Sequence, residues 1–105
     1  MKNVTQEEWE RLIENDDKAV VIDSRTPLEW REGIQENALM MDVNQPLIFE
    51  KEAGKLQKDK NYYVYCRSGQ RSIRACTLLE SAGIQNTYNL LGGMMHWHGK
   101  VVDPA

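Results

Sequence analysis

The pattern of apolar and polar residues changes twice within one short stretch of the chain, Tyr62-Tyr63-Val64-Tyr65-Cys66-Arg67-Ser68-Gly69-Gln70-Arg71-Ser72. Residues 62–65 are aromatic or β-branched, which is the composition of a buried strand. Residues 67–70 are polar and include a glycine, so they predict a tight loop. Beyond residue 71 the apolar positions recur at helical spacing, at Ala75, Leu78, Leu79 and Ala82. The stretch therefore predicts a strand, a cysteine, a short loop and a helix, in that order.

This order has a chemical consequence for Cys66. A loop that enters a helix points several backbone N–H groups at one spot, and the helix dipole adds partial positive charge there. Such surroundings favour the thiolate over the thiol, and Arg67 and Arg71 add two fixed positive charges. The alternative is a cysteine buried as a small apolar residue. The grouping of a cysteine, a glycine and two arginines at a strand-to-helix turn favours a nucleophile.

Three motifs resemble the rhodanese family of sulfurtransferases. Residues 66–72 are similar to its active-site loop, in which a cysteine is often followed by arginine at the second and sixth positions. Residues 23–30, Asp-Ser-Arg-Thr-Pro-Leu-Glu-Trp, resemble its N-terminal signature, and residues 92–97, Gly-Gly-Met-Met-His-Trp, resemble its C-terminal one. The resemblance implies that Cys66 is the catalytic residue. It also implies that Asp23 and Arg25, just past a strand, support the loop; a loop salt bridge or a local turn contact of Asp23 is the alternative.

One stretch departs from the family pattern. The usual motif Gly-His-Ile-x-Gly-Ala is replaced by Gly33-Ile34-Gln35-Glu36-Asn37-Ala38, without the histidine and the second glycine. We therefore expect a difference in packing here and an unchanged catalytic loop.

The remaining pattern alternates between helix and strand along the chain. Thr5 with Glu8, and Thr26 with Glu29, have the spacing of capping boxes at two helix starts. We expect strands over residues 19–22, 39–43, 62–65 and 87–91, helices over 6–15, 27–32, 47–56, 72–82 and 94–98, and a tail over 101–105. Such alternation implies crossover units in a parallel sheet. With the resemblance, this predicts one rhodanese-like domain over residues 1–105: a three-layer α/β fold whose mostly parallel sheet has about five strands and helices on both faces.

Composition narrows the choice of partners. A chain of 105 residues with a net charge of −3 has no basic footprint for nucleic acid, and it has no apolar run of membrane-spanning length. Two cysteines without a secretory signal predict reduced thiols and a cytoplasmic location. We expect Cys76 to be structural, His96 and His98 to be surface residues rather than metal ligands, and no cofactor.

These observations predict a sulfurtransferase. Cys66 would take sulfane sulfur from thiosulfate or a persulfide and pass it to cyanide, to a thiol or to an acceptor protein. Arg67 and Arg71 would bind the small anionic donor, and Ser68, Gly69, Gln70 and Ser72 would shape the loop. One alternative is a persulfide carrier that acts with a partner protein. Another is a cysteine-based phosphatase or arsenate reductase, although those enzymes hold five residues between cysteine and arginine, and this chain holds four.

Overall fold

Five parallel strands form one sheet in a computed structural model that describes residues 1–104. The strands are β1 (Lys2–Val4), β2 (Ala19–Asp23), β3 (Leu39–Met40), β4 (Asn61–Tyr65) and β5 (Asn86–Leu90), in the order β1-β5-β4-β2-β3. The helices are α1 (Gln6–Glu14), α2 (Pro27–Trp30), α3 (Pro46–Gly54), α4 (Arg71–Ser81) and the 3₁₀ helix η1 (Gly93–His96). The expected α/β fold with a parallel sheet is confirmed.

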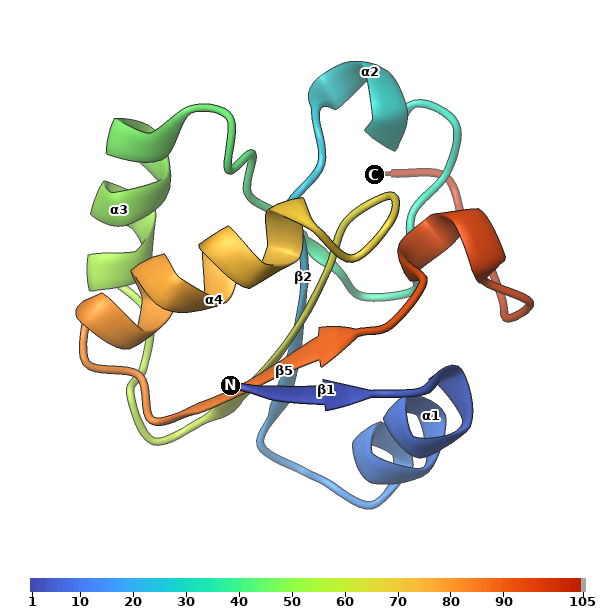
Figure 1. The fold of residues 1–105 in the computed structure, drawn as a ribbon, viewed down its shortest axis with the longest axis horizontal. Coiled ribbons are helices and arrows are strands. Elements are labelled where there is room, and N and C mark those ends of the chain that lie inside the picture. The colour runs from blue at the N-terminus through green and yellow to red at the C-terminus, as the bar shows by residue number, and fades with distance from the viewer. Residues whose placement is uncertain (105) are drawn as a thin grey trace.

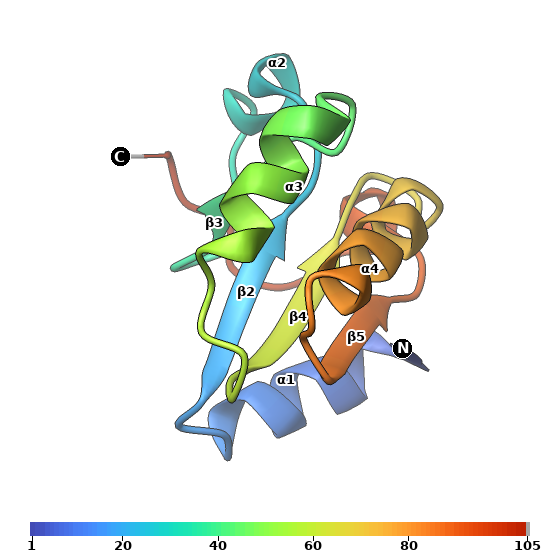
Figure 2. The same ribbon diagram turned by 90° about the vertical axis from the view of Figure 1, so that its left-hand side faces the viewer.

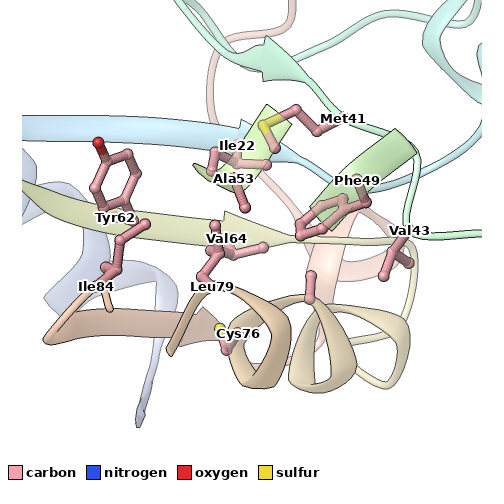
Figure 3. Close-up of a cluster of buried hydrophobic side chains, with 11 residues drawn as sticks. Ile22, Met41, Val43, Phe49, Ala53, Tyr62, Val64, Cys76, Leu79 and Ile84 are labelled. Atoms are coloured by element: carbon pink, nitrogen blue, oxygen red, sulfur yellow. The ribbon is translucent and has the colours of Figure 1, made fainter. Parts of the chain in front are cut away.

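The central strand β4 is buried on both faces, and its side chains divide between two cores. Tyr62 and Val64 point into the core beneath α3 and α4, which Figure 3 shows with Phe49 and Leu79. Tyr63 and Tyr65 point the other way, onto Trp9 of α1. Helices α3 and α4 therefore cover one face of the sheet and α1 covers the other, as Figure 2 shows. This division follows from the two-residue period of a strand.

Both predicted capping boxes are present. The Thr5 hydroxyl accepts a hydrogen bond from the backbone N–H of Glu8, and the Glu8 carboxylate accepts from the N–H of Thr5. Thr26 and Glu29 make the same pair at the start of α2. The second box fixes where α2 begins, next to the carboxyl end of β2.

The structure differs from the expected elements in three main places. Strand β1 was not among the predicted strands, because its three residues are too few to show a periodicity; it exists through pairing with β5, where Asn3 faces Asn89. The strand predicted over 39–43 is only Leu39–Met40, although the N–H of Val43 still bonds to Ser24. In the described part of the expected tail, Val102 forms a two-way backbone bridge with Ile34, so these residues are tied to the domain.

Asn37 explains how the stretch without the second glycine still makes its turn. Its φ of 65° lies in the left-handed region, which asparagine tolerates better than other non-glycine residues. Two residues earlier, the buried side chain of Gln35 accepts a hydrogen bond from the indole N–H of Trp9 over 3.0 Å. The departure from the family motif is thus a difference in local packing on the α1 side of the sheet.

The loop after β4 lies at the carboxyl edge of the sheet. In Figure 1 this yellow loop lies between the start of α4, the cyan α2 and the red η1. Ligands of open parallel sheets bind beyond this edge. Over the described residues, no helix combines the length and apolarity needed to cross a membrane.

Candidate active site

Cys66 directly follows β4, and its side chain is completely buried under the loop. The backbone N–H of Gly69 donates to its Sγ over 3.1 Å, and the hydroxyl of Ser72, in the first turn of α4, lies 3.3 Å from the same sulfur. Gly69 has a φ of +96°, which a residue with a side chain rarely adopts. The loop therefore closes around the sulfur with a glycine at its tightest point.

The pKa of Cys66 lies below the ordinary value for a thiol. Burial acts to raise the pKa, but hydrogen bonds from the hydroxyl of Ser72 and from the backbone N–H groups of Ser72, Gly69 and Ser68 outweigh it. These donors favour the charged form because a thiolate accepts hydrogen bonds more strongly than a neutral thiol does. The arrangement supplies a nucleophilic thiolate nearer to neutral pH.

The predicted Gly-Gly motif holds the other side of the loop. Backbone N–H groups of Met94 and Met95 donate to the carbonyls of Cys66 and Arg67, each over 2.9 Å. A Cβ atom on Gly93 would lie only 2.5 Å from both carbonyl oxygens. Only glycine permits this approach, so η1 can pack directly on the loop backbone.

The two loop arginines have different surroundings. Arg71 makes a bidentate ion pair with Glu29 of α2, with both N–O distances at 2.8 Å, and this pair lowers the pKa of Glu29 to about 2. Arg67 makes no ion pair within residues 1–104 and borders a pocket of about 220 Å³ together with Met94 and Met95. The unpaired positive charge beside the loop is thus that of Arg67, in a pocket that Glu29 and Glu32 also line, whereas the charge of Arg71 is largely neutralised.

Asp23 and Arg25 form a buried ion pair that contacts Tyr65, the residue before Cys66. Three N–O distances between their side chains fall between 2.8 and 3.1 Å, and Arg25 also donates to the carbonyl of Gly33. The hydroxyl of Tyr65 donates to Asp23 over 2.7 Å, and Ser24 donates to the carbonyl of Tyr65 from both its N–H and its hydroxyl. The pair is therefore joined to the end of β4, where Cys66 begins the loop.

The other predicted loop residues divide between outside and inside. The side chains of Ser68 and Gln70 are exposed, and that of Ser72 is buried.

Two residues at the site were not predicted from the sequence. Glu29 was read as part of a cap and of the N-terminal signature but not as the partner of Arg71, and the buried Asn89 of β5, which contacts Ser72, was read only as part of a strand. An amide side chain in the middle of the strand predicted over 87–91 was the available signal for Asn89.

The second cysteine has the opposite environment. Cys76 lies on the core-facing side of α4 and is buried (Figure 3), and desolvation raises the pKa of its thiol to about 12. It stays a neutral thiol over the physiological range, and both cysteines are free. Among residues 1–104, no three His, Cys, Asp or Glu side chains gather as a metal site.

Comparisons with known proteins point to one family. Residues 5–100 match the sequence model described as rhodanese-like domain. A sulfurtransferase of Allochromatium vinosum is 34% identical over 92 residues, which cover 86% of this chain and 82% of that protein. A tRNA uridine(34) hydroxylase of Pelagibacter ubique is 34% identical over 95 residues, but the match spans only 31% of that longer protein. A crystal structure of a rhodanese-like domain protein from Staphylococcus aureus superposes with a TM-score of 0.84 at 25% identity and covers both chains completely.

Proposed function

Because this chain belongs to the rhodanese-like domain family and has relatives named sulfurtransferases, we propose that it moves sulfane sulfur through a persulfide on Cys66. The observation that carries the proposal is the environment of the sulfur. Sγ receives hydrogen bonds from loop and helix donors, and its pKa is lowered although the side chain is buried. Cys76 shows the contrast, because burial outweighs the hydrogen bond that Thr87 supplies and raises the pKa of its thiol.

In the first half-reaction, the Cys66 thiolate attacks the outer sulfur of thiosulfate. A bond forms between Sγ and this sulfur, the bond between the two sulfur atoms of the donor breaks, and sulfite leaves with the electron pair. The persulfide keeps its negative charge on the terminal sulfur, where backbone N–H groups of the loop can stabilise it. Since Cys66 is fully buried, the donor reaches Sγ only when the loop moves slightly outward.

In the second half-reaction, a nucleophilic acceptor attacks the terminal sulfur of the persulfide. The sulfur–sulfur bond to Cys66 breaks and its electron pair returns to Sγ, which restores the thiolate. Cyanide would give thiocyanate, and a thiolate would give a new persulfide. A low-molecular-weight thiol and the thiol of an acceptor protein are both acceptors of the required chemistry.

Intact-protein mass spectrometry tests the persulfide directly. After brief incubation with thiosulfate, the protein is expected to gain the mass of one sulfur atom and to lose it again when cyanide is added. The Cys76→Ala variant should load equally, because the thiol of Cys76 is neutral and buried. No gain with thiosulfate would exclude it as the donor, and no gain with a low-molecular-weight persulfide either would refute the proposed function.

The pH dependence of loading follows from the low pKa of Cys66. Only the thiolate attacks the donor, so the loading rate should rise with pH and level off once Cys66 is ionised. We expect the midpoint below about 8.5, the ordinary value of a cysteine. Single-turnover loading, followed by mass spectrometry across a pH series, measures it. A midpoint at or above that of a free cysteine would contradict the role assigned to the loop donors.

Arg67 is expected to bind the anionic donor. Its side chain borders the pocket beside the loop, and its charge is not neutralised by an ion pair with another described residue. Arg67→Ala should therefore raise the KM for thiosulfate about tenfold. The double variant Arg71→Ala/Glu29→Gln should affect KM less, because it removes both charges of an ion pair that is already nearly neutral. Arg74→Ala, an exposed change of the same charge on α4, is the matched control. Steady-state kinetics of the three variants decide the matter; equal KM values for Arg67→Ala and Arg74→Ala would remove Arg67 from donor binding.

A further inference from the structure

The hydroxyl of Ser72 faces two acceptors with a single hydrogen. Its Oγ lies 3.3 Å from Sγ of Cys66 and is also in close contact with Oδ1 of Asn89. A serine hydroxyl donates only one hydrogen bond, although it can accept others. It therefore cannot donate to the sulfur and to the asparagine carbonyl at the same time.

The neighbours of Asn89 fix which end of its amide faces Ser72. Its Nδ2 lies 3.2 Å from the backbone carbonyl oxygen of Gly69, and a backbone carbonyl can only accept. The second hydrogen of Nδ2 is donated to Oδ1 of Asn3 over 3.0 Å. A flipped amide would set two carbonyl oxygens against each other at Gly69. Oδ1 of Asn89, which is 1% exposed, therefore faces Ser72 and depends on it for a donor.

Two arrangements of hydrogens follow, one for each protonation state of Cys66. With a thiol, the S–H group donates to Oγ of Ser72 and the serine hydroxyl donates to Asn89, so every group has a partner. With a thiolate, the serine hydroxyl must turn to the sulfur, and the buried carbonyl of Asn89 loses its donor. A buried acceptor without a donor is unfavourable. Asn89 thus works against the thiolate, whereas Ser72 works for it.

We propose that Asn89 is a positioning residue that competes with the Cys66 thiolate for the single hydroxyl hydrogen of Ser72. The inference deepens the proposed function, on which it rests. In the persulfide, Sγ no longer carries the charge, so the hydroxyl returns to Asn89. The competition therefore disfavours the resting thiolate relative to the persulfide, and it keeps the thiolate reactive by limiting its hydrogen bonds. Relative to the thiolate, Asn89 therefore favours the persulfide without touching the donor.

The charged groups around Cys66 do not provide this effect, because most of them hold a constant charge near neutral pH. Arg71 is paired with Glu29, and the Asp23–Arg25 pair is buried. His96 lies in η1, whose residues Met94 and Met95 bond to the loop backbone. The charged or titratable side chains on the elements that pack around the sulfur are Asp23 and Arg25 at the end of β2, Glu29 of α2, Tyr62, Tyr63 and Tyr65 of β4, Arg67 of the loop, Arg71, Arg74, Cys76 and Glu80 of α4, Tyr88 of β5 and His96 of η1. A His96→Gln background removes the histidine from the measurement.

The test measures the pKa of Cys66 without using sulfur transfer. In protein labelled with ¹³C at the cysteine Cβ atoms, the resonance of Cys66, assigned with Cys66→Ser, is followed against pH. We expect Ser72→Ala to raise the pKa by about one pH unit and Asn89→Ala to lower it by about half a unit. The decisive comparison is Asn89→Ala in the Ser72→Ala background, where the lowering should vanish. Asn3→Ala leaves the contact between Asn89 and Ser72 in place and should leave the pKa unchanged.

Two results would overturn the proposal. One is a pKa that rises or stays the same in Asn89→Ala, and the other is an equal shift in both backgrounds, which would mean that Asn89 acts through its bond to Gly69 alone. A measurement on the unsubstituted protein covers variants that fail to fold. There the side-chain carbonyl carbon of Asn89 should shift with the same midpoint as Cys66, and the step should disappear in Cys66→Ala. These titrations need no sulfur donor, so they can succeed or fail independently of the proposed function.

Discussion

Replacement of Cys66 by serine is expected to reduce sulfur transfer from thiosulfate to cyanide by at least about three orders of magnitude. A serine hydroxyl is not ionised near neutral pH, and it forms no persulfide. The substitution is close to isosteric, and the donors from Gly69 and Ser72 can still bond to the new oxygen. Fold and stability should therefore remain near those of the unsubstituted protein while the chemistry is lost.

The control for this prediction is the second cysteine. Cys76→Ala removes the only other thiol of the chain, which is buried in the core and has a pKa of about 12, so transfer should continue at nearly the original rate. The measurement is thiocyanate formation under saturating thiosulfate, with circular dichroism to establish that both variants are folded. Transfer that survives in folded Cys66→Ser would show that the sulfur is carried elsewhere.

Replacement of Asp23 by alanine is expected to lower the free energy of unfolding by about 3–5 kcal/mol. The change leaves the guanidinium of Arg25, a residue only 5% exposed, without its carboxylate. It also removes the acceptor of the Tyr65 hydroxyl, next to Cys66. For a domain of this size, such a loss is a large share of the total stability.

Denaturant unfolding measures this loss, and two further variants locate its cause. Asp17→Ala removes an acidic side chain at an exposed position and should change stability by less than about 0.5 kcal/mol. The double variant Asp23→Leu/Arg25→Met should recover part of the loss, because no uncompensated charge stays buried. A loss of less than about 1 kcal/mol in Asp23→Ala would mean that the ion pair does not support the end of β4.

Some features of the fold and of the site were predicted from the sequence and are present in the structure as single contacts. The capping boxes of Thr5 and Thr26 are local, because their partners are three residues away. The strand-cysteine-loop-helix order around Cys66 depends on composition and on a change of period within one short stretch. Asn37 was read as a missing glycine, and the structure shows that an asparagine with positive φ takes the same place.

Features that depend on distant partners were not accessible in this way. The pairing of β1 with β5 brings Asn3 to Asn89 across the sheet, and no periodicity in three residues could indicate it. Arg71 was expected to bind the donor together with Arg67. In the structure its guanidinium forms an ion pair with Glu29, which lies 42 residues earlier in the chain.

The sequence by itself determined that Cys66 would lie at the end of a strand and what kind of loop would surround it, because strand, turn and helix signals are local in the chain. Only the tertiary structure decided which polar groups meet at that cysteine. Ser72 and Asn89 are 17 residues apart, and Tyr65 and Asp23 are 42 apart, so their contacts exist only once β5, β4 and β2 lie side by side. The balance of hydrogen bonds at the sulfur is therefore set by the packing of the strands, since burial leaves each polar group dependent on the few partners that the fold brings to it.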